Sequence, residues 1–436
     1  MSDRLSTVTP RVAAAAFLLL AFVPCGWAER ITFRQALELA MKRSPEVGIA
    51  SAEEVRAHQG YLETKTGYIP QITVGSGIAK VWGYPMSIEG SAPSVFNVNT
   101  QSYLINWAQR DFVGAAHTDW NAAGDQLEDQ RQATLLETIL VYIQLDQLTS
   151  SLQTLQQELE EAERLESISR DRLQEGIDSK LDLSKASLNA AQVRLRLTGV
   201  QGNVDLLHQR LGQLTGLNPH ELETDSSSIP ERPEISQQDD VAARAVANNP
   251  AVKAAEEKAK SSERRAQGEH RQLYPAVDLV GNYGLFTKNY NLDLLFPPGK
   301  FSTNNATFGI DVRFPVLNFT QRSRATAADA EALKARKQAD AIRAQVANDA
   351  LRVQRANARL TAARDVAQLE HEVAVAEAEA AQGRVQAGTG TIKDVEKARI
   401  EAADKQAAFE SAQFELDRAR LQLLRVTGEL EKWALP

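Results

Sequence analysis

The stretch that decides the fold of this 436-residue chain occurs twice, as RLQEGIDSKLDL at residues 172–183 and as RVQAGTGTIKDV at residues 384–395. The two copies superimpose without a gap at an offset of 388 − 176 = 212 residues, which places Gly176 on Gly388. In each copy a glycine interrupts a long run of helix-forming residues, and the run resumes within a few residues. Each copy is therefore predicted to be the turn of a tight helical hairpin.

The residues on either side of each glycine support this interpretation. A glycine after the last helical turn suits the left-handed conformation in which many helices end. Ser179 and Thr391 then provide side-chain oxygens that can cap the first turn of the returning helix. The alternative is a mere break in each helix, but the matched positions of the two turns favour paired hairpins.

The repeat extends well beyond the two turns. Landmark residues of 172–216 match those of 384–428 at the same offset, and a second block at an offset of 250 − 45 = 205 places Pro45 on Pro250. The chain therefore consists of two versions of one unit of roughly 200 residues, and pseudo-symmetry is expected between them. The predicted segments are a first repeat, a linker, a second repeat and a C-terminal tail, at residues 29–216, 217–240, 241–428 and 429–436.

Most of the chain is predicted to be long α-helix. Helices over about residues 113–175 and 320–386 would each be ~95 to 100 Å long at 1.5 Å per residue, which requires helical neighbours along their length. Both carry apolar residues at heptad spacing that predict a coiled-coil seam. The first seam consists of Val141, Leu145, Leu148, Leu152, Leu155, Leu159 and Ala162. The second consists of Val366, Leu369, Val373, Ala376 and Ala380.

Four short segments differ from the helical blocks, because they are rich in β-branched and aromatic residues and alternate in polarity. They span residues 71–82, 97–108, 276–287 and 304–315. In the last of them Phe308, Ile310 and Val312 alternate with polar residues, which predicts a strand with one apolar face. A length of about 12 residues suits a tilted membrane strand, which needs ~9 to 11.

A soluble β-sandwich would alternate in the same way, so the assignment to a membrane depends on further observations. Aromatic residues lie towards the segment ends, as in an aromatic girdle: Trp82, Tyr103, Trp107, Tyr283 and Phe314. Two hairpins, at residues 71–108 and 276–315, cannot close a barrel or bury a core alone. Their links, residues 83–96 and 288–303, are long and rich in Pro, Gly, Ser and Asn, which is typical of external barrel loops.

Residues 1–28 are predicted to be a secretory signal peptide, with Arg4 and Arg11 before or at the start of an apolar run and a small-residue site at Ala28. The only cysteine, Cys25, lies in this segment. Lipidation of Cys25 is an alternative, although the residues before it form a poor lipobox. Cleavage after Ala28 would leave a chain without cysteine, and therefore without disulfides or thiolate metal sites.

Composition argues against several function classes. Loss of residues 1–28 would change the net charge from −8 to −8 − 1 = −9, which gives no reason to expect nucleic acid as a partner. The six histidines are scattered, without the spacing of metal ligands, and no phosphate loop or nucleophile elbow occurs. No later apolar run approaches the ~20 residues of a membrane helix. We therefore predict no enzyme activity, no cofactor and no metal site.

The signal peptide, the duplication, the paired β-hairpins and the paired long helical hairpins, in this order, resemble the TolC-type outer-membrane factor family, also called outer membrane efflux proteins. These are the exit ducts of bacterial drug efflux pumps and type I secretion systems. The sharpest local matches are ITFRQAL at residues 31–37, which leads to Ser44 and Pro45, the counterpart that ends in Asn249 and Pro250, and the two glycine turns. The resemblance covers essentially the whole chain after residue 28.

The resemblance implies a mainly α-helical fold with a β-barrel part. In the family, three chains each contribute four transmembrane strands to one 12-stranded barrel in the outer membrane. The long helical hairpins form an α-barrel across the periplasm. A homotrimer in outer-membrane lipid is therefore expected, with a periplasmic adaptor and an inner-membrane transporter as partners. Trimerisation would also pair the strand edges that four strands leave open.

The resemblance also assigns a periplasmic gate to the second hairpin. Asp394 matches the family's gate aspartate, which by threefold symmetry would form a ring of carboxylates that concentrates cations. A second aspartate of well-known members is Lys397 here, and a locking arginine is Gly390, which implies a looser and less cation-selective gate. The alternative for Asp394 is a solvated carboxylate in a first helical turn, where the macrodipole favours it.

Adaptor contacts are expected at the same two turns. The candidates are Arg172, Gly176, Leu181 and Asp182 in the first turn, and Arg384, Gly388, Ile392 and Asp394 in the second. The glycines could instead serve chain reversal alone. Two other interpretations of the whole chain stay open at this point. One is a periplasmic coiled-coil scaffold or adaptor without a pore, and the other is an envelope hydrolase, which the missing catalytic constellation disfavours.

Overall fold

The computed structural model describes residues 29–76, 94–219, 222–231, 240–286, 299 and 302–435. The predicted signal peptide, Trp82 and most of the two predicted external loops lie outside these residues. The chain divides into two compact units, each described by itself below. The first comprises Met1–Pro45, Thr134–Glu234 and Glu431–Pro436, and the second comprises Glu46–Ala133 and Ile235–Leu430. These units do not coincide with the two sequence repeats.

The first unit contains a small parallel sheet and the first helical hairpin. Strand β1 (Glu29–Ile31) pairs with β4 (Leu222–Thr224), which is followed by the 3-10 turn η2 (Ser226–Ser228). The predicted linker thus includes regular structure, and its residues 232–239 lie outside the described part. Three helices and the C-terminal part of a fourth complete the unit: α1 (Phe33–Arg43), α4 (Lys180–Thr215), α9 (Leu430–Ala434) and α3 (Trp107–Gln174).

A buried tyrosine on α3 holds the small sheet in place. The side chain of Tyr142 is fully buried, and its hydroxyl donates to the carbonyl of Ile31 at 2.7 Å and accepts from the amide of Asp225 at 2.8 Å. The ring of Phe33 meets the Tyr142 ring edge to face, with centroids 5.5 Å apart. A phenol with both hydrogen-bonding roles satisfied is a favourable core residue. Tyr142 therefore joins β1 and the segment after β4 to the long helix.

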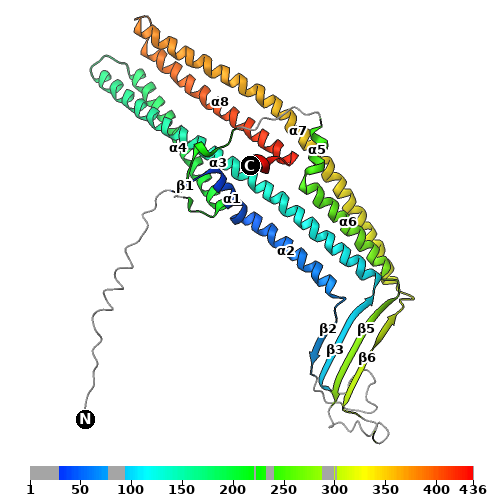
Figure 1. Ribbon diagram of the computed structural model, residues 1–436. Coiled ribbons are helices and arrows are strands. Elements are labelled where there is room, and N and C mark those ends of the chain that lie inside the picture. The colour runs from blue at the N-terminus through cyan, green and yellow to red at the C-terminus, as the bar shows by residue number, and fades with distance from the viewer. Residues whose placement is uncertain are drawn as a thin grey trace, which may run out of the picture. The chain divides into compact units, whose positions relative to one another are not determined.

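Helices α3 and α4 lie antiparallel in the first hairpin (Figure 1). The predicted seam of α3 is confirmed, because Leu145 is buried and Leu159 packs against a cluster of Ala162, Ala190 and Val193. Small and branched residues facing one another allow the two helices to approach closely. The apolar side chains of α3 therefore form the core of this hairpin.

The second unit contains the second hairpin, the remaining helices and the larger sheet. Helix α7 (Phe319–Gln386) packs against both α8 (Ile392–Thr427) and α6 (Pro250–Arg271), and α5 (Val241–Asn248) contacts α7 and α8. Helix α2 (Pro45–Thr66) and the start of α3 complete it. Corresponding helices of the two repeats have equal lengths: 68 residues in α3 and α7, 36 in α4 and α8, and 22 in α2 and α6.

The predicted seam of α7 is not buried within the second hairpin. Val366, Leu369 and Val373 are exposed within the chain, with 56 %, 61 % and 58 % of their surface accessible. The buried positions in this stretch of α7 are instead small residues, such as Ala374 and Ala381. Alanine lets neighbouring helices approach closely, so the larger apolar residues are left on the outside of the hairpin. Among the described residues no helix combines the length and apolarity needed to cross a membrane.

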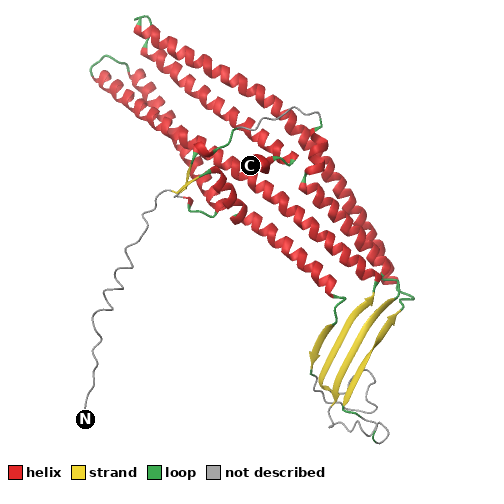
Figure 2. Cartoon of the chain, in the orientation of Figure 1, coloured by secondary structure: helices red, strands yellow, loops and turns green. Residues whose placement is uncertain are grey.

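Four antiparallel strands form the larger sheet, in the order β2 (Gln71–Gly75), β3 (Ser94–Ile105), β5 (Ala276–Phe286) and β6 (Asn304–Arg313) (Figure 2). The predicted pairs of strands are therefore present and join through β3 and β5. The predicted limits 97–108 are wrong, because Trp107 is the first residue of α3. Asn106 ends the strand, since its side chain accepts from the amide of Gln109 at 3.0 Å and caps the helix.

The sheet has one apolar and one polar face. Phe308, Ile310 and Val312 are exposed on one face, as the alternation predicted. On the other face Asn282 of β5 lies between Asn99 of β3 and Thr307 of β6, and the amide of Asn282 donates to Asn99 Oδ1. Within the described residues β2 and β6 are edge strands with no partner on their outer sides. An exposed apolar face and two open edges are unfavourable for an isolated chain in water.

Candidate functional site

The first hairpin turn closes with the hydrogen bonds of a Schellman motif. Helix α3 ends at Gln174, and Gly176 takes a left-handed φ of 78°. The amide of Ile177 donates to the carbonyl of Arg172 at 2.8 Å. The amide of Gly176 donates to the carbonyl of Leu173 at 3.1 Å. These bonds satisfy carbonyl groups that the end of a helix leaves without partners, and only glycine adopts this φ without strain.

The second turn repeats this pattern atom for atom. Gly388 has a φ of 74°, and its amide donates to the carbonyl of Val385 at 3.0 Å. The amide of Thr389 donates to the carbonyl of Arg384 at 2.9 Å. The predicted glycine caps are therefore confirmed at both turns. Chain reversal alone gives a sufficient physical reason for both glycines.

Both returning helices begin with a capping box. Ser179 Oγ accepts from the amide of Asp182 at 3.2 Å, and Asp182 Oδ2 accepts from the amide of Ser179 at 3.2 Å. Thr391 and Asp394 exchange the same pair of bonds, at 3.3 Å and 3.2 Å. The predicted N-caps Ser179 and Thr391 are therefore confirmed. The two aspartates occupy the third helical position, where a carboxylate can satisfy the N-cap amide.

The carboxylate of Asp394 is exposed and favoured in its ionised form. Hydrogen bonds from the side chain and the amide of Thr391 lower the pKa of Asp394, and the nearby charges of Arg384 and Lys393 lower it further. Its position in the first turn of α8 adds the favourable field of the helix dipole. Asp394 therefore carries a full negative charge at neutral pH, and it also has a structural role as a helix cap.

The two turns differ at one position beside the glycine. In the first, Asp178 pairs with Arg172, with 3.1 Å between Nε and Oδ1, and also accepts from Ser169 Oγ at 3.2 Å. In the second, the counterpart of Asp178 is Gly390, since 178 + 212 = 390. Arg384 is the counterpart of Arg172, and it therefore meets no carboxylate at that position. The Arg172–Asp178 ion pair therefore stabilises the first turn, and the second turn has no such pair at the matched position.

Crowding explains why a glycine suits position 390. A Cβ atom there would lie 2.9 Å from the Cβ of Arg384 and 3.2 Å from the backbone nitrogen of Val385. The amide of Gly390 also donates to the carbonyl of Arg384 at 3.0 Å. Because backbone atoms are involved, a side chain at 390 would require the turn to shift. The backbone around position 390 therefore favours glycine.

The other predicted site residues lie around these turns. Leu181 is 61 % exposed in the first turn of α4. Ile392 is the first residue of α8, and its side chain lies outside the described part of the structure. Lys397 is exposed and follows Asp394 by three residues on α8, close to the same side of the helix. Each turn thus brings its own candidates together within a single hairpin.

Sequence reasoning missed two ionisable groups near the turns. Asp178 was not recognised as a partner of Arg172, although the six-residue spacing across a glycine turn allows the pair. Glu396 is half-buried on α8, and this burial raises the pKa of its carboxyl. Its counterpart in the first repeat is Ser184, since 184 + 212 = 396. A position-by-position comparison of the two repeats would have identified both differences.

Comparisons with known proteins agree with this arrangement. A model of the outer membrane efflux protein family matches residues 36–217 and 241–429. The outer membrane efflux protein BepC of Brucella suis biovar 1 (strain 1330) is 23 % identical over 324 residues, which cover 74 % of this chain and 69 % of BepC. The match to the family model therefore extends over both repeats.

Solved structures show the same fold. The outer membrane protein VceC of Vibrio cholerae superimposes with a TM-score of 0.71 at 20 % identity, over 91 % of this chain and 96 % of VceC. The outer membrane channel CmeC of Campylobacter jejuni superimposes with a TM-score of 0.74 at 15 % identity, over 91 % of this chain and 86 % of CmeC. The long helical hairpins and the four-stranded sheet are thus a known architecture.

Proposed function

The chain belongs to the outer membrane efflux protein family, and on that premise we propose how its parts build an exit duct. The protein is an efflux channel of the outer membrane that extends into the periplasm. In our proposal, three copies join their sheets into one barrel and their helical hairpins into a cylinder. A periplasmic adaptor and an inner-membrane transporter deliver the substrate to the hairpin turns.

The two-faced sheet is the observation that carries this proposal. One chain leaves β2 and β6 with open edges, and exposes Phe308, Ile310 and Val312 together on one face. In a closed ring of sheets every edge is paired, the apolar face meets lipid and the polar face meets water. Three chains of four strands satisfy all of these requirements.

The helical hairpins support an assembly of several chains independently. Leu181, Leu188 and Leu195 lie seven residues apart on α4 and are 61 %, 58 % and 74 % exposed. The exposed apolar residues of α7 described above form a second such row. Rows of exposed apolar residues at heptad spacing are typical of helices that pack against partners. Neighbouring copies of the chain would cover both rows.

This assembly can be tested with the full chain purified in detergent from outer membranes. Native mass spectrometry is expected to give the mass of three chains, and the complex is expected to dissociate on heating. Replacing Leu188 and Leu195 by Asp should reduce the trimer fraction, because each charge would be buried between chains. A matched Glu263→Gln change on the exposed side of α6 should leave it unchanged. A functional monomer would contradict the proposal.

We also propose that Asp394 lines the periplasmic constriction and that Lys397 partly offsets its charge. The ionised, exposed carboxylate of Asp394 supports this role, since three of them around an axis would attract cations. In planar-bilayer recordings, Asp394→Asn should lower the cation preference and weaken block by multivalent cations. Lys397→Asp should do the opposite. If neither change alters conductance or selectivity, Asp394 is a helix cap only.

The two turns are the proposed contact sites of the adaptor. The candidates are Arg172, Gly176, Leu181 and Asp182 in one, and Arg384, Gly388, Ile392 and Asp394 in the other. Support comes from the exposure of those candidates whose side chains are described, and from the absence of a buried role for Leu181 within the described chain. In cells, Leu181→Asp should abolish export while trimers still reach the outer membrane. Normal export by this variant would show that the first turn is not part of the adaptor contact.

A further inference from the structure

A hollow of about 890 Å³ lies in the second unit among α2, α3, α6 and α7. It shares Glu53, Gln126 and Lys258 with a second hollow of about 810 Å³. That one shares Gln71 and Tyr103 with a third, of about 520 Å³, on the polar face of the sheet. The three hollows therefore form one continuous concave surface along the unit.

The order of the elements and the continuity of the hollows show which way this surface faces. Helix α2 leads into β2 and helix α7 follows β6, so these helices extend the two edges of the sheet. Because the three hollows are continuous, this one opens on the same side as the polar face of the sheet, which is the inner side of the channel proposed above. This inner side is the conduit. The hollow of about 890 Å³ is thus a recess in the conduit wall at the level of the helices.

The floor of this recess is apolar. It is formed largely by small and branched side chains of α2, α6 and α7, which include Ile49, Ala50, Ala254, Ala339 and Ile342. Ile49 is a large apolar residue that is 63 % exposed, so its side chain does not belong to the core of the described chain. Alanines from neighbouring helices make a shallow surface on which a flat or rounded apolar molecule can bury area.

The rim of the recess is acidic, and one carboxylate is not neutralised. Glu53 of α2 has no hydrogen bond or ion pair with any described residue. Asp129 pairs with Arg425 at 3.3 Å. Lys258 is the only basic residue in the lining, and its Nζ donates to Asp119 Oδ1 at 3.0 Å.

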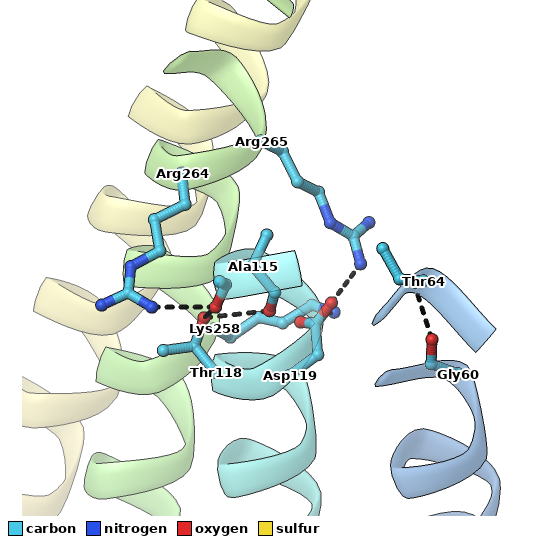
Figure 3. Close-up of polar contacts among 9 residues, drawn as sticks. Gly60, Thr64, Ala115, Thr118, Asp119, Lys258, Arg264 and Arg265 are labelled. Carbon is cyan, nitrogen blue, oxygen red and sulfur yellow. Dashed lines mark hydrogen bonds and ion pairs between the residues drawn. The ribbon is translucent and has the colours of Figure 1, made fainter. Parts of the chain in front are cut away.

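Figure 3 shows how the lysine is neutralised. Asp119 lies between Lys258 and Arg265 and accepts from both, while Arg264 turns away to the carbonyl of Gly114 at 2.9 Å. Lys258 and the two arginines of α6 are therefore directed at protein acceptors, whereas Arg56, one turn from Glu53 on α2, lines only the second hollow. Among the residues that line the recess itself, the negative charge of Glu53 is therefore not compensated by a cation.

We propose that this recess is a transit site for amphiphilic organic cations, whose apolar body lies on the alanine and isoleucine floor and whose positive charge faces Glu53. The inference rests on the proposed channel function and specifies a substrate class for it. A volume of about 890 Å³ lies in the range of pockets that accept drug-sized molecules, ~300 to 1,000 Å³. Attraction to a carboxylate at the rim favours a cation over a neutral or anionic molecule of the same shape.

The test compares two ions of similar size and shape but opposite charge. Binding of tetraphenylphosphonium and of tetraphenylborate to the purified full chain is measured by isothermal titration calorimetry. We expect tetraphenylphosphonium to bind more tightly. Glu53→Gln should weaken its binding about threefold to tenfold, as expected for removal of one partly screened charge. Ile49→Asn should weaken both ions, because it makes the floor polar.

Glu263→Gln is the matched control, since Glu263 is an exposed carboxylate of the same helical wall that does not line the recess. It should leave binding within about twofold of the original chain. Equal binding of the two ions, or equal losses from Glu53→Gln and Glu263→Gln, would overturn the proposal. Conductance of the same preparations in planar bilayers separates the two levels. If the chain conducts but binds the two ions equally, only the proposal of the recess fails. If the chain does not conduct, the proposed channel function fails.

Discussion

The two helical hairpins have equal lengths and the same glycine cap and capping box at their turns, but they bury different side chains. Leu145, Leu152 and Leu159 lie seven residues apart along α3; Leu145 is buried, Leu152 is half-buried and Leu159 packs against the core cluster of the first hairpin. At the matched positions of α7, 212 residues later, stand three polar residues: Asn357, Arg364 and His371. Each of these has a buried nitrogen or oxygen atom without a hydrogen-bond partner. The duplicated unit therefore has an apolar seam in one copy and a polar seam in the other.

This difference predicts that the two hairpins differ in stability, although their backbones are alike. Buried polar atoms without partners cost free energy, whereas buried leucines stabilise a helix pair. Nε of Arg364 does lie 3.2 Å from Asp365 Oδ1, but outside hydrogen-bond geometry, so the contact compensates little. His371 stacks on Phe409 with ring centroids 6.4 Å apart. The second hairpin, which carries the proposed gate, is thus expected to open locally at lower cost than the first.

The largest expected effect is the loss of a seam leucine. Leu145 is 1 % exposed, so Leu145→Ala should destabilise the first hairpin by ~2 to 5 kcal/mol through lost burial and a cavity. Asn357→Ala at the matched position should cost less than ~1 kcal/mol, because it also removes an unpaired polar atom. Hydrogen exchange of α3 and α7, read by mass spectrometry, measures both. Equal effects would mean that the two seams do not differ in energy.

A smaller effect is expected from exchanging residues between the seams. His371→Leu copies the first hairpin and should stabilise α7 by ~1 to 2 kcal/mol, since the unpaired Nδ1 atom is removed. The reverse change, Leu159→His, should destabilise α3 by a similar amount. Urea denaturation of the purified trimer compares the two variants. The comparison fails if both changes shift the unfolding midpoint in the same direction.

The turns should respond alike, because their geometry is alike. Gly176→Ala and Gly388→Ala should each cost ~1 kcal/mol, since a Cβ is strained at positive φ while no neighbouring atom lies within 4 Å of it. Gly383→Ala, inside α7, is the control and should stabilise the helix by ~0.5 to 1 kcal/mol. Thermal unfolding of the three variants provides the measurement. A cost at only one turn would show that the turns are not equivalent.

The smallest expected effect is a pH response of the second hairpin. Burial raises the pKa of Glu396, so the folded state favours its neutral form, and this contribution is lost as the pH rises above the ordinary range of a glutamate, about 4 to 5. Asp394 has a lowered pKa, so its capping contribution is present above the ordinary aspartate range and is lost at lower pH. Glu396→Gln and Asp394→Asn should therefore change the melting temperature with opposite pH dependence. Parallel profiles would contradict the assignment.

Part of this architecture could be predicted from the sequence, because local chemistry determines it. The glycine turns, the caps Ser179 and Thr391 and the alternation at residues 304–315 depend on nearest neighbours. The end of β3 was missed, since the capping role of Asn106 outweighs the β propensity of the residues after it.

The second seam could not be predicted from hydrophobicity. The periodicity of Val366, Leu369 and Val373 shows that these residues share a side of α7, but not whether that side faces α8 or another chain. The residues that do face inward are alanines and polar groups, which give no apolar signal. The recess near Glu53 was also missed, because it is lined by four helices from distant parts of the sequence.

The central claim is that the polar face of the sheet lines a water-filled duct and the apolar face meets lipid. Single cysteines at Thr307 and Ile310 test it in a Cys25→Ser background, since Cys25 is the only cysteine of the sequence. Conductance through a planar lipid bilayer is recorded before and after a charged, membrane-impermeant methanethiosulfonate is added. The account predicts a stepwise fall in conductance for Thr307→Cys and no change for Ile310→Cys. A response at Ile310→Cys alone, or equal responses at both positions, would contradict it.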